Sequence, residues 1–206
     1  MKQPEEYYYQ KMNRAKQAVY RVMLRGLLDL ADEALLAERI GKAMMLNPTW
    51  NELDRGVWSR EKLLQSFIKE APDLEQEIRL VFSDLSTIVR KFPKSDSWVQ
   101  SLKDRGYHVF YLSNYSSHVR KDTEKELTFM KLMDGGIMSY EVQLIKPDLA
   151  IYQTLMARYD LQPEECVFLD DTKANIDGAL RAGMQGILVK TQEQAMKDLD
   201  ELLKTN

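Results

Sequence analysis

The sequence predicts an α/β protein in which an all-helical first half precedes a core built on a parallel sheet. Two observations support this prediction. Before Pro93, apolar residues recur mostly at spacings of three and four, as on one face of a helix. After Pro93, short apolar segments alternate with helical ones, which is typical of a parallel sheet covered by helices on both faces. We therefore place the division between the two halves near residue 93.

In the first half we expect helix over residues 10–46 and shorter helices over residues 50–92. Asn47 and Pro48 separate the two stretches, because the residue before a proline is pushed out of the helical region. Ser59 is a candidate N-cap for a helix within the second stretch.

In the second half, four short apolar segments rich in branched and aromatic residues predict buried strands. Gly183 fits the position just after a helix end. The predicted strands cover residues 107–112, 136–139, 166–169 and 186–189, and the predicted helices cover residues 98–106, 148–158, 174–182 and the tail from residue 192.

Composition excludes several classes of protein. The chain has 206 residues, and 29 basic against 32 acidic residues leave a net charge of −3, so no nucleic-acid partner is expected. No apolar stretch approaches the roughly 18 residues of a membrane helix, and no signal peptide is expected. The single cysteine, Cys166, fits a reducing compartment, so we expect a cytoplasmic location.

Polar residues follow the predicted strands where ligands bind in open α/β sheets, beyond the carboxyl ends. Ser113 and Asn114 follow one strand, Asp170 and Asp171 follow another, and Lys146 precedes a helix. Taken singly, each has a plain interpretation as a turn, a cap or a solvated side chain. Taken together, they offer a cation for a phosphate, donors for its oxygens and a carboxylate for Mg²⁺, which suits phosphoryl transfer.

Three segments resemble, in order and spacing, motifs II, III and IV of the haloacid dehalogenase (HAD) superfamily. The likeness is strongest to small sugar-phosphate phosphatases and to the phosphatase domain of soluble epoxide hydrolase. The segments are Leu112-Ser113-Asn114, Ile145-Lys146-Pro147-Asp148 with Ile151-Tyr152, and Phe168-Leu169-Asp170-Asp171 with Asn175, Ala179 and Gly183.

The resemblance implies a Mg²⁺-dependent phosphatase acting on a small phosphorylated metabolite, such as a sugar phosphate. Ser113 and Asn114 would hold the transferring phosphoryl group. Lys146 would offset negative charge on the nucleophile and phosphate, and Lys146 and Asp170 are the candidate catalytic residues.

The resemblance also implies a metal site and a division of the chain. Asp171 would be a Mg²⁺ ligand, supported by Asp170 and Asn175. Three parts are expected: an atypical helical segment over residues 1–40, a helical cap over residues 41–93 that chooses the substrate, and a Rossmann-like HAD core over residues 94–206.

One family motif is missing. Members of the superfamily begin with a central strand that ends in Asp-x-Asp, whose first aspartate is the covalent nucleophile. Asp29 and Asp32 lie in a helical context instead. Asp84 follows an apolar segment, but Ser86 stands where the second carboxylate belongs, and the segment matches the last cap helix. We therefore expect helix there.

Three explanations of the missing motif remain open: a truncated or fused reading frame, an inactive relative kept for binding or regulation, and completion of the site by another element or a partner chain. The apolar stripe over residues 10–40 could form a homodimer or bind a partner helix, or it could pack on the cap. A phosphoacceptor receiver domain is set aside because its acidic pair comes first in the chain. A dehalogenase proper needs no metal, so Asp171 argues against it.

Overall fold

The computed structural model describes residues 33–205, so the predictions for residues 1–32 lie outside the described part. The chain divides into two compact units. One contains the described residues up to Arg90 together with Tyr115–Glu126, and the other contains Lys91–Asn114 and the residues from Leu127 onward.

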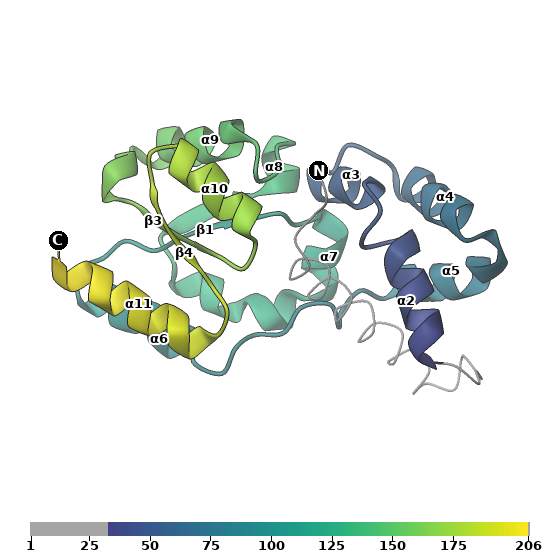
Figure 1. The fold of residues 1–206 in the computed structure, drawn as a ribbon, viewed down its shortest axis with the longest axis horizontal. Helices are drawn as coiled ribbons and strands as arrows, with labels where there is room; N and C mark the ends of the chain where they lie inside the picture. The colour runs from purple at the N-terminus through teal and green to yellow at the C-terminus, as the bar shows by residue number, and fades with distance from the viewer. Residues whose placement is uncertain (1–32, 206) are drawn as a thin grey trace. The chain divides into compact units, whose positions relative to one another are not determined.

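In its described part, the first unit consists of helices joined by turns and extended segments, with no strand. In helix α4, Ser59 is the N-cap as predicted, because its hydroxyl accepts a hydrogen bond from the Lys62 amide at 3.3 Å. The side chain of Phe67 is completely buried, and its ring packs on the rings of Trp50 and Phe82. The helices are α2 (Glu33–Ala43), α3 (Thr49–Arg55), α4 (Arg60–Glu70), the 3₁₀ turn η1 (Pro72–Leu74), α5 (Glu75–Ser83) and α7 (Ser117–Asp122) (Figure 1).

The helical prediction for residues 50–92 is wrong after Ser83, where α5 ends. Asp84 has an extended backbone, and its carboxylate accepts a hydrogen bond from the Ser86 amide at 3.0 Å. This turn competes with the helical hydrogen bonds and stops the helix.

The second unit alternates between helices and strands, as predicted. The strand predicted over residues 107–112 begins and ends later in the structure, because β1 starts at Phe110 and includes Ser113. In chain order the elements are α6 (Ser95–Asp104), β1 (Phe110–Ser113), η2 (Glu124–Leu132, which belongs to this unit from Leu127 onward), β2 (Gly135–Met138), α8 (Ser139–Val142), α9 (Leu149–Tyr159), η3 (Pro163–Glu165), β3 (Val167–Asp170), α10 (Lys173–Arg181), β4 (Gln185–Leu188) and α11 (Gln192–Thr205).

The strands are parallel, as predicted, and form two pairs, β1 with β2 and β3 with β4. Successive peptide groups of a strand point to opposite edges. The Val109 carbonyl bonds toward β2, so the peptide groups of Phe110 and Leu112 face the other edge of β1. The Cys166 and Asp170 carbonyls bond toward β4, so those of Val167 and Leu169 face the other edge of β3. No strand in the described range pairs with either of these edges, which we call the unpaired edges.

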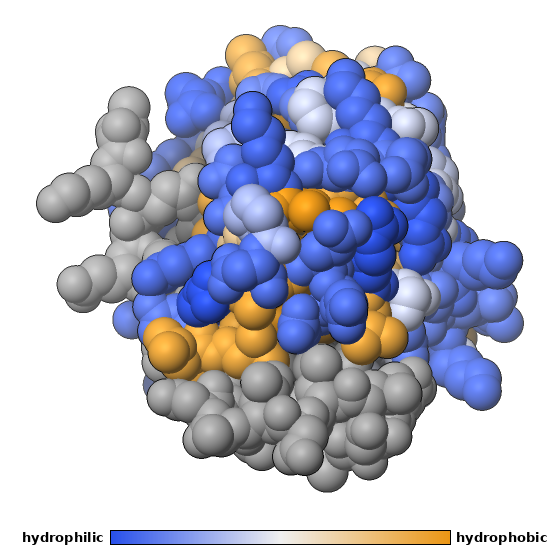
Figure 2. Space-filling model, turned by 90° about the vertical axis from the view of Figure 1, so that its right-hand side faces the viewer, coloured by the Kyte–Doolittle hydropathy of each residue, from blue (hydrophilic) through white to orange (hydrophobic). Residues whose placement is uncertain are grey.

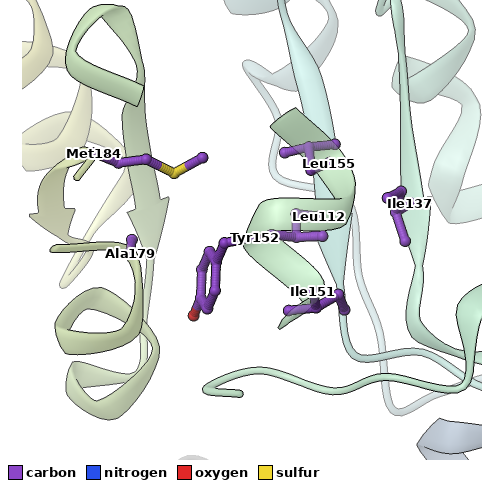
Figure 3. Packing of buried hydrophobic residues seen from close by; sticks show 7 residues of the cluster. All are labelled: Leu112, Ile137, Ile151, Tyr152, Leu155, Ala179 and Met184. Carbon is purple, nitrogen blue, oxygen red and sulfur yellow. The ribbon is translucent and has the colours of Figure 1, made fainter. Parts of the chain in front are cut away.

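Helices cover both faces of the strands. On one face, α9 and α10 contribute to an apolar cluster, seven of whose residues appear in Figure 3. On the other face, Leu102 of α6 and Leu199 of α11 pack on Ile187 of β4. Alternate residues of β3 point to opposite faces. Phe168 packs in the cluster with α9 and α10, and Val167 and Leu169 pack in the cluster with α6 and α11.

The surface is mainly polar. On the face drawn in Figure 2, hydrophilic side chains predominate among the described residues, and apolar ones appear in smaller groups. No helix within residues 33–205 is long and apolar enough to cross a membrane.

Candidate active site

Lys146 is a buried lysine that joins the two strand pairs. Its ammonium donates to the Leu112 carbonyl of β1 at 2.8 Å and to Oδ2 of Asp170, at the end of β3, at 2.6 Å. Nζ also lies 5.2 Å from the centre of the Phe168 ring, within range of a cation–π contact. Only 8% of Lys146 is exposed, so it is not a solvated surface lysine.

Both carboxylate oxygens of Asp170 are engaged. Oδ2 accepts from Lys146, while Oδ1 accepts from the Thr172 amide at 2.8 Å and from Nδ2 of Asn175 at 2.9 Å. Three donors on one buried carboxylate fix its orientation and compensate the loss of its hydration.

Asn114 positions the main chain of Lys146. Its Oδ1 accepts from the Lys146 amide at 2.8 Å, and its Nδ2 donates to the Lys146 carbonyl at 3.0 Å. This reciprocal pair connects the loop after β1 to the segment before α9. Asn114 is therefore a structural partner of Lys146, and its role toward a phosphoryl group stays a prediction.

Ser113 and Asp171 adjoin this network along the chain. Ser113 ends β1 and is half-buried, and its hydroxyl makes no hydrogen bond within the described part of the protein. Asp171 is half-buried, and its Oδ1 accepts from the Thr172 hydroxyl at 3.3 Å. The structure thus gathers the predicted residues at the carboxyl ends of β1 and β3, while their catalytic roles stay predictions.

The donor set fits a weakly held, largely hydrated Mg²⁺. Mg²⁺ commonly keeps several waters and takes one or two carboxylates. Asp170 is bound to Lys146, which leaves Asp171 as the carboxylate better placed for a metal. No cluster of three or more His, Cys, Asp or Glu residues suited to a metal occurs among residues 33–205.

The alternative nucleophile can be placed as well. The helical interpretation of its segment holds only up to Ser83, because Asp84 follows the last residue of α5 with an extended backbone, and Asp84 lies in the first unit. Asp29 and Asp32 lie outside the described residues. Cys166 is half-buried, and burial raises the pKa of its thiol, which disfavours the reactive thiolate.

Sequence reasoning assigned no role to Tyr152 or Thr172. The Tyr152 hydroxyl donates to the Asn175 carbonyl at 2.7 Å, and the Thr172 amide binds Asp170. The Tyr152 contact depends on how α9 packs against α10, which the helical spacing of residues does not reveal. Thr172 follows the paired aspartates directly, so a turn closing on Asp170 was the available signal.

The core is a parallel α/β arrangement with a buried lysine and paired aspartates at the carboxyl ends of its strands. Known proteins to which this chain is similar include hydrolases. The family model for haloacid dehalogenase-like hydrolases matches residues 4–183. The chain therefore belongs to the haloacid dehalogenase-like hydrolase family.

Relatives include phosphatases. The chain is 28% identical over 185 residues to the glyceraldehyde 3-phosphate phosphatase of Methanothermobacter thermautotrophicus, covering 86% of this chain and 77% of that protein. It is 26% identical over 159 residues to acyl-CoA dehydrogenase family member 10 of Mus musculus, covering 75% of this chain but only 15% of the mouse protein.

Solved structures show the same fold. A HAD family enzyme from Bacteroides thetaiotaomicron, solved in complex with magnesium and inorganic phosphate, superposes with a TM-score of 0.61. The identity is 16%, and the match covers 87% of this chain and 86% of that one. At this identity the likeness concerns the fold.

Proposed function

We propose that this HAD-like hydrolase is a phosphatase that acts on a small phosphate monoester, with a sugar phosphate as the expected class, and uses Mg²⁺. The observation that supports this most is the buried Lys146, held between the Leu112 carbonyl and Asp170. It places a fixed positive charge at the strand ends, on the carbonyl of the residue that precedes Ser113 in β1. We propose further that residues 41–93 form the cap that selects the substrate.

The charge balance of the site favours a divalent cation. Lys146 is paired with Asp170, and Asp171 is a second carboxylate directly after the same strand. A phosphate dianion placed against these carboxylates would be repelled by them, which a Mg²⁺ ion at Asp171 would relieve. When bound, Mg²⁺ would supply charge neutralisation for the phosphate oxygens. The magnesium and phosphate in the Bacteroides thetaiotaomicron enzyme are consistent with this proposal.

A second candidate function is that of a binding or regulatory protein. Covalent phosphoryl transfer in this family needs an aspartate nucleophile. Among residues 33–205, the carboxylates of this network belong to Asp170, which holds Lys146, and Asp171, the proposed metal ligand. A chain that binds phosphate without hydrolysing it would account for this arrangement.

The two functions are separated by assaying the full chain with p-nitrophenyl phosphate and Mg²⁺. For a phosphatase we expect turnover that Asp171→Ala lowers by more than the roughly 10- to 100-fold that loss of an outer-shell partner costs a metal site. Asp177→Ala, which removes an exposed carboxylate of α10 paired with Lys173, should leave turnover unchanged. Equal turnover in all three proteins would contradict the proposed role of Asp171.

The same proteins test binding when no turnover is seen. Inorganic phosphate titrated by calorimetry in the presence of Mg²⁺ should bind the unaltered chain and Asp177→Ala, and bind Asp171→Ala more weakly. Binding without turnover supports the second function. Neither binding nor turnover refutes both.

We also expect Mg²⁺ alone to bind weakly, because one carboxylate, Asp171, is its principal side-chain ligand and Asp170 is held by Lys146. Isothermal titration of the full chain with MgCl₂ should give an affinity weaker than micromolar, with Asp177→Ala as the control. Micromolar affinity would show that further ligands take part.

A further inference from the structure

Tyr152 lies in the core next to the acidic residues of the site. Its side chain is completely buried, and in Figure 3 its ring lies between α9 and the part of the core that carries Ala179. The ring meets that of Phe168 edge to face, with centroids 5.5 Å apart and planes at 85°. Phe168 in turn lies under the ammonium of Lys146, so the Phe168 ring separates Tyr152 from the Lys146–Asp170 pair.

The hydroxyl of Tyr152 reaches the residue that orients Asp170. It donates to the main-chain carbonyl of Asn175 at 2.7 Å, in the first turn of α10. The side chain of Asn175 donates to Oδ1 of Asp170 at 2.9 Å, and Oδ2 of Asp170 holds Lys146. One chain of hydrogen bonds thus connects α9, α10 and the end of β3.

Gly178 provides the space for this contact. A Cβ added at Gly178 would lie 2.7 Å from the Tyr152 hydroxyl oxygen and 3.0 Å from the Pro147 carbonyl oxygen. Real Cβ atoms do not approach so closely, so a side chain here would displace the hydroxyl. This observation is independent of the hydrogen bonds and shows that α10 is shaped to receive the phenol.

The hydroxyl stays protonated. Burial, and then the negative charge of Asp170, raise the pKa of Tyr152 above its usual range. A neutral phenol is the form that donates the hydrogen bond to the Asn175 carbonyl.

We propose that Tyr152 is a positioning residue, which fixes the Asp170 carboxylate by holding Asn175 at the start of α10. Without the hydroxyl, the Asn175 carbonyl loses a hydrogen-bond donor. The hydrogen bond from the Asn175 side-chain amide to Asp170 then loosens, and Asp170 holds the ammonium of Lys146 less firmly. The hydrogen-bond coupling from Tyr152 through Asn175 and Asp170 to Lys146 does not depend on the proposed function. Only its consequence for catalysis rests on that function.

The test compares Tyr152→Phe with Tyr159→Phe in the full ¹⁵N-labelled chain. Both tyrosines lie on α9, and both hydroxyls bond to main-chain groups, that of Tyr159 to Gly136. Each change keeps the ring and removes one hydroxyl. The readouts are the NMR signals of the Asn175 side-chain amide and of the Lys146 ammonium, which we expect to exchange slowly with water because it is buried and makes two hydrogen bonds.

We expect Tyr152→Phe to shift the Asn175 amide signals and to speed hydrogen exchange of the Lys146 ammonium several-fold, whereas Tyr159→Phe should change neither. If both variants lose stability alike and both signals stay in place, Tyr152 serves packing only and the proposal is overturned. If Tyr152→Phe does not fold, Gly178→Ala replaces it, since it displaces the same hydroxyl and should give the same shifts.

These readouts require no turnover, so an inactive chain still tests the coupling. Should the chain be active, Tyr152→Phe should lower kcat several-fold with KM little changed, and Tyr159→Phe should leave kcat unaltered. An unchanged kcat together with shifted signals would uphold the positioning and refute its catalytic consequence.

Discussion

At the scale of the residue, the contribution of the Lys146–Asp170 pair depends on its neighbours. Both side chains are about 7% exposed, so each loses most of its hydration on folding. The Leu112 carbonyl, the Thr172 amide and the Asn175 side chain supply hydrogen bonds that replace water. Removing one partner would leave the other as an uncompensated buried charge.

Asp170→Ala should therefore lower the free energy of unfolding by about 3–5 kcal/mol. Urea denaturation followed by circular dichroism measures this loss. The matched control Asp177→Ala breaks an exposed pair with Lys173 and should cost about 0.5 kcal/mol or less.

A double variant, Lys146→Met with Asp170→Ala, should be less destabilised than the sum of the two single variants, because no buried charge is left unpaired.

For the single variant Asp170→Ala, a loss of unfolding free energy below about 1 kcal/mol would contradict the prediction, because it would mean that Lys146 finds another partner or reaches water.

At the scale of the element, Asp134 anchors the start of the β1–β2 pair. Its carboxylate accepts from the Val109 amide at 2.8 Å and from the ammonium of Lys103 on α6, and its own amide donates to the Val109 carbonyl at 2.9 Å. The Lys103 hydrogen bond, followed by the Val109 amide, lowers the pKa of Asp134. One side chain thereby connects a helix end to the beginning of a strand.

A carboxyl whose pKa is lower in the folded state stabilises the fold above its unfolded pKa, about 3.9 for aspartate, and this stabilisation disappears as pH falls through the folded value. Asp134→Asn should thus cost about 0.5–1 kcal/mol at pH 7, and the difference from the unaltered chain should shrink below about pH 4.

Thermal or urea unfolding across this pH range measures the difference. Asp96→Asn is the control, because Asp96 pairs with Lys91 at the surface without a main-chain bond to a strand. A gap between Asp134→Asn and the unaltered chain that persists at low pH would contradict an ionic origin.

At the scale of the whole molecule, the sequence predicts two features of the second unit. One is the order of its helices and strands, and the other is the position of Ser113, Lys146 and Asp170 near the strand ends. Alternation of apolar segments fixes the strands, and parallel strands bring their carboxyl ends to one edge. The end of α5 at Ser83 could not be predicted, because a local turn at Asp84 outweighs the helical spacing.

The hydrogen bonds of the site were also beyond sequence reasoning. That Asn114 binds the main chain of Lys146, and that Tyr152 reaches Asn175, depends on how a loop and two helices pack, which residue spacing does not encode. The family motifs locate such residues along the chain but do not assign their partners.

The unpaired edges have a consequence for the role of Lys146. The peptide groups of Phe110, Val167 and Leu169 face these edges, as does that of Leu112, whose carbonyl accepts from Lys146. Amide groups at a strand edge without a neighbour are templates for further strands, which natural proteins normally cover or charge. Along residues 33–205, the Lys146 ammonium occupies one acceptor of these edges, the Leu112 carbonyl, so this lysine also covers part of a strand edge that would otherwise be open to another strand.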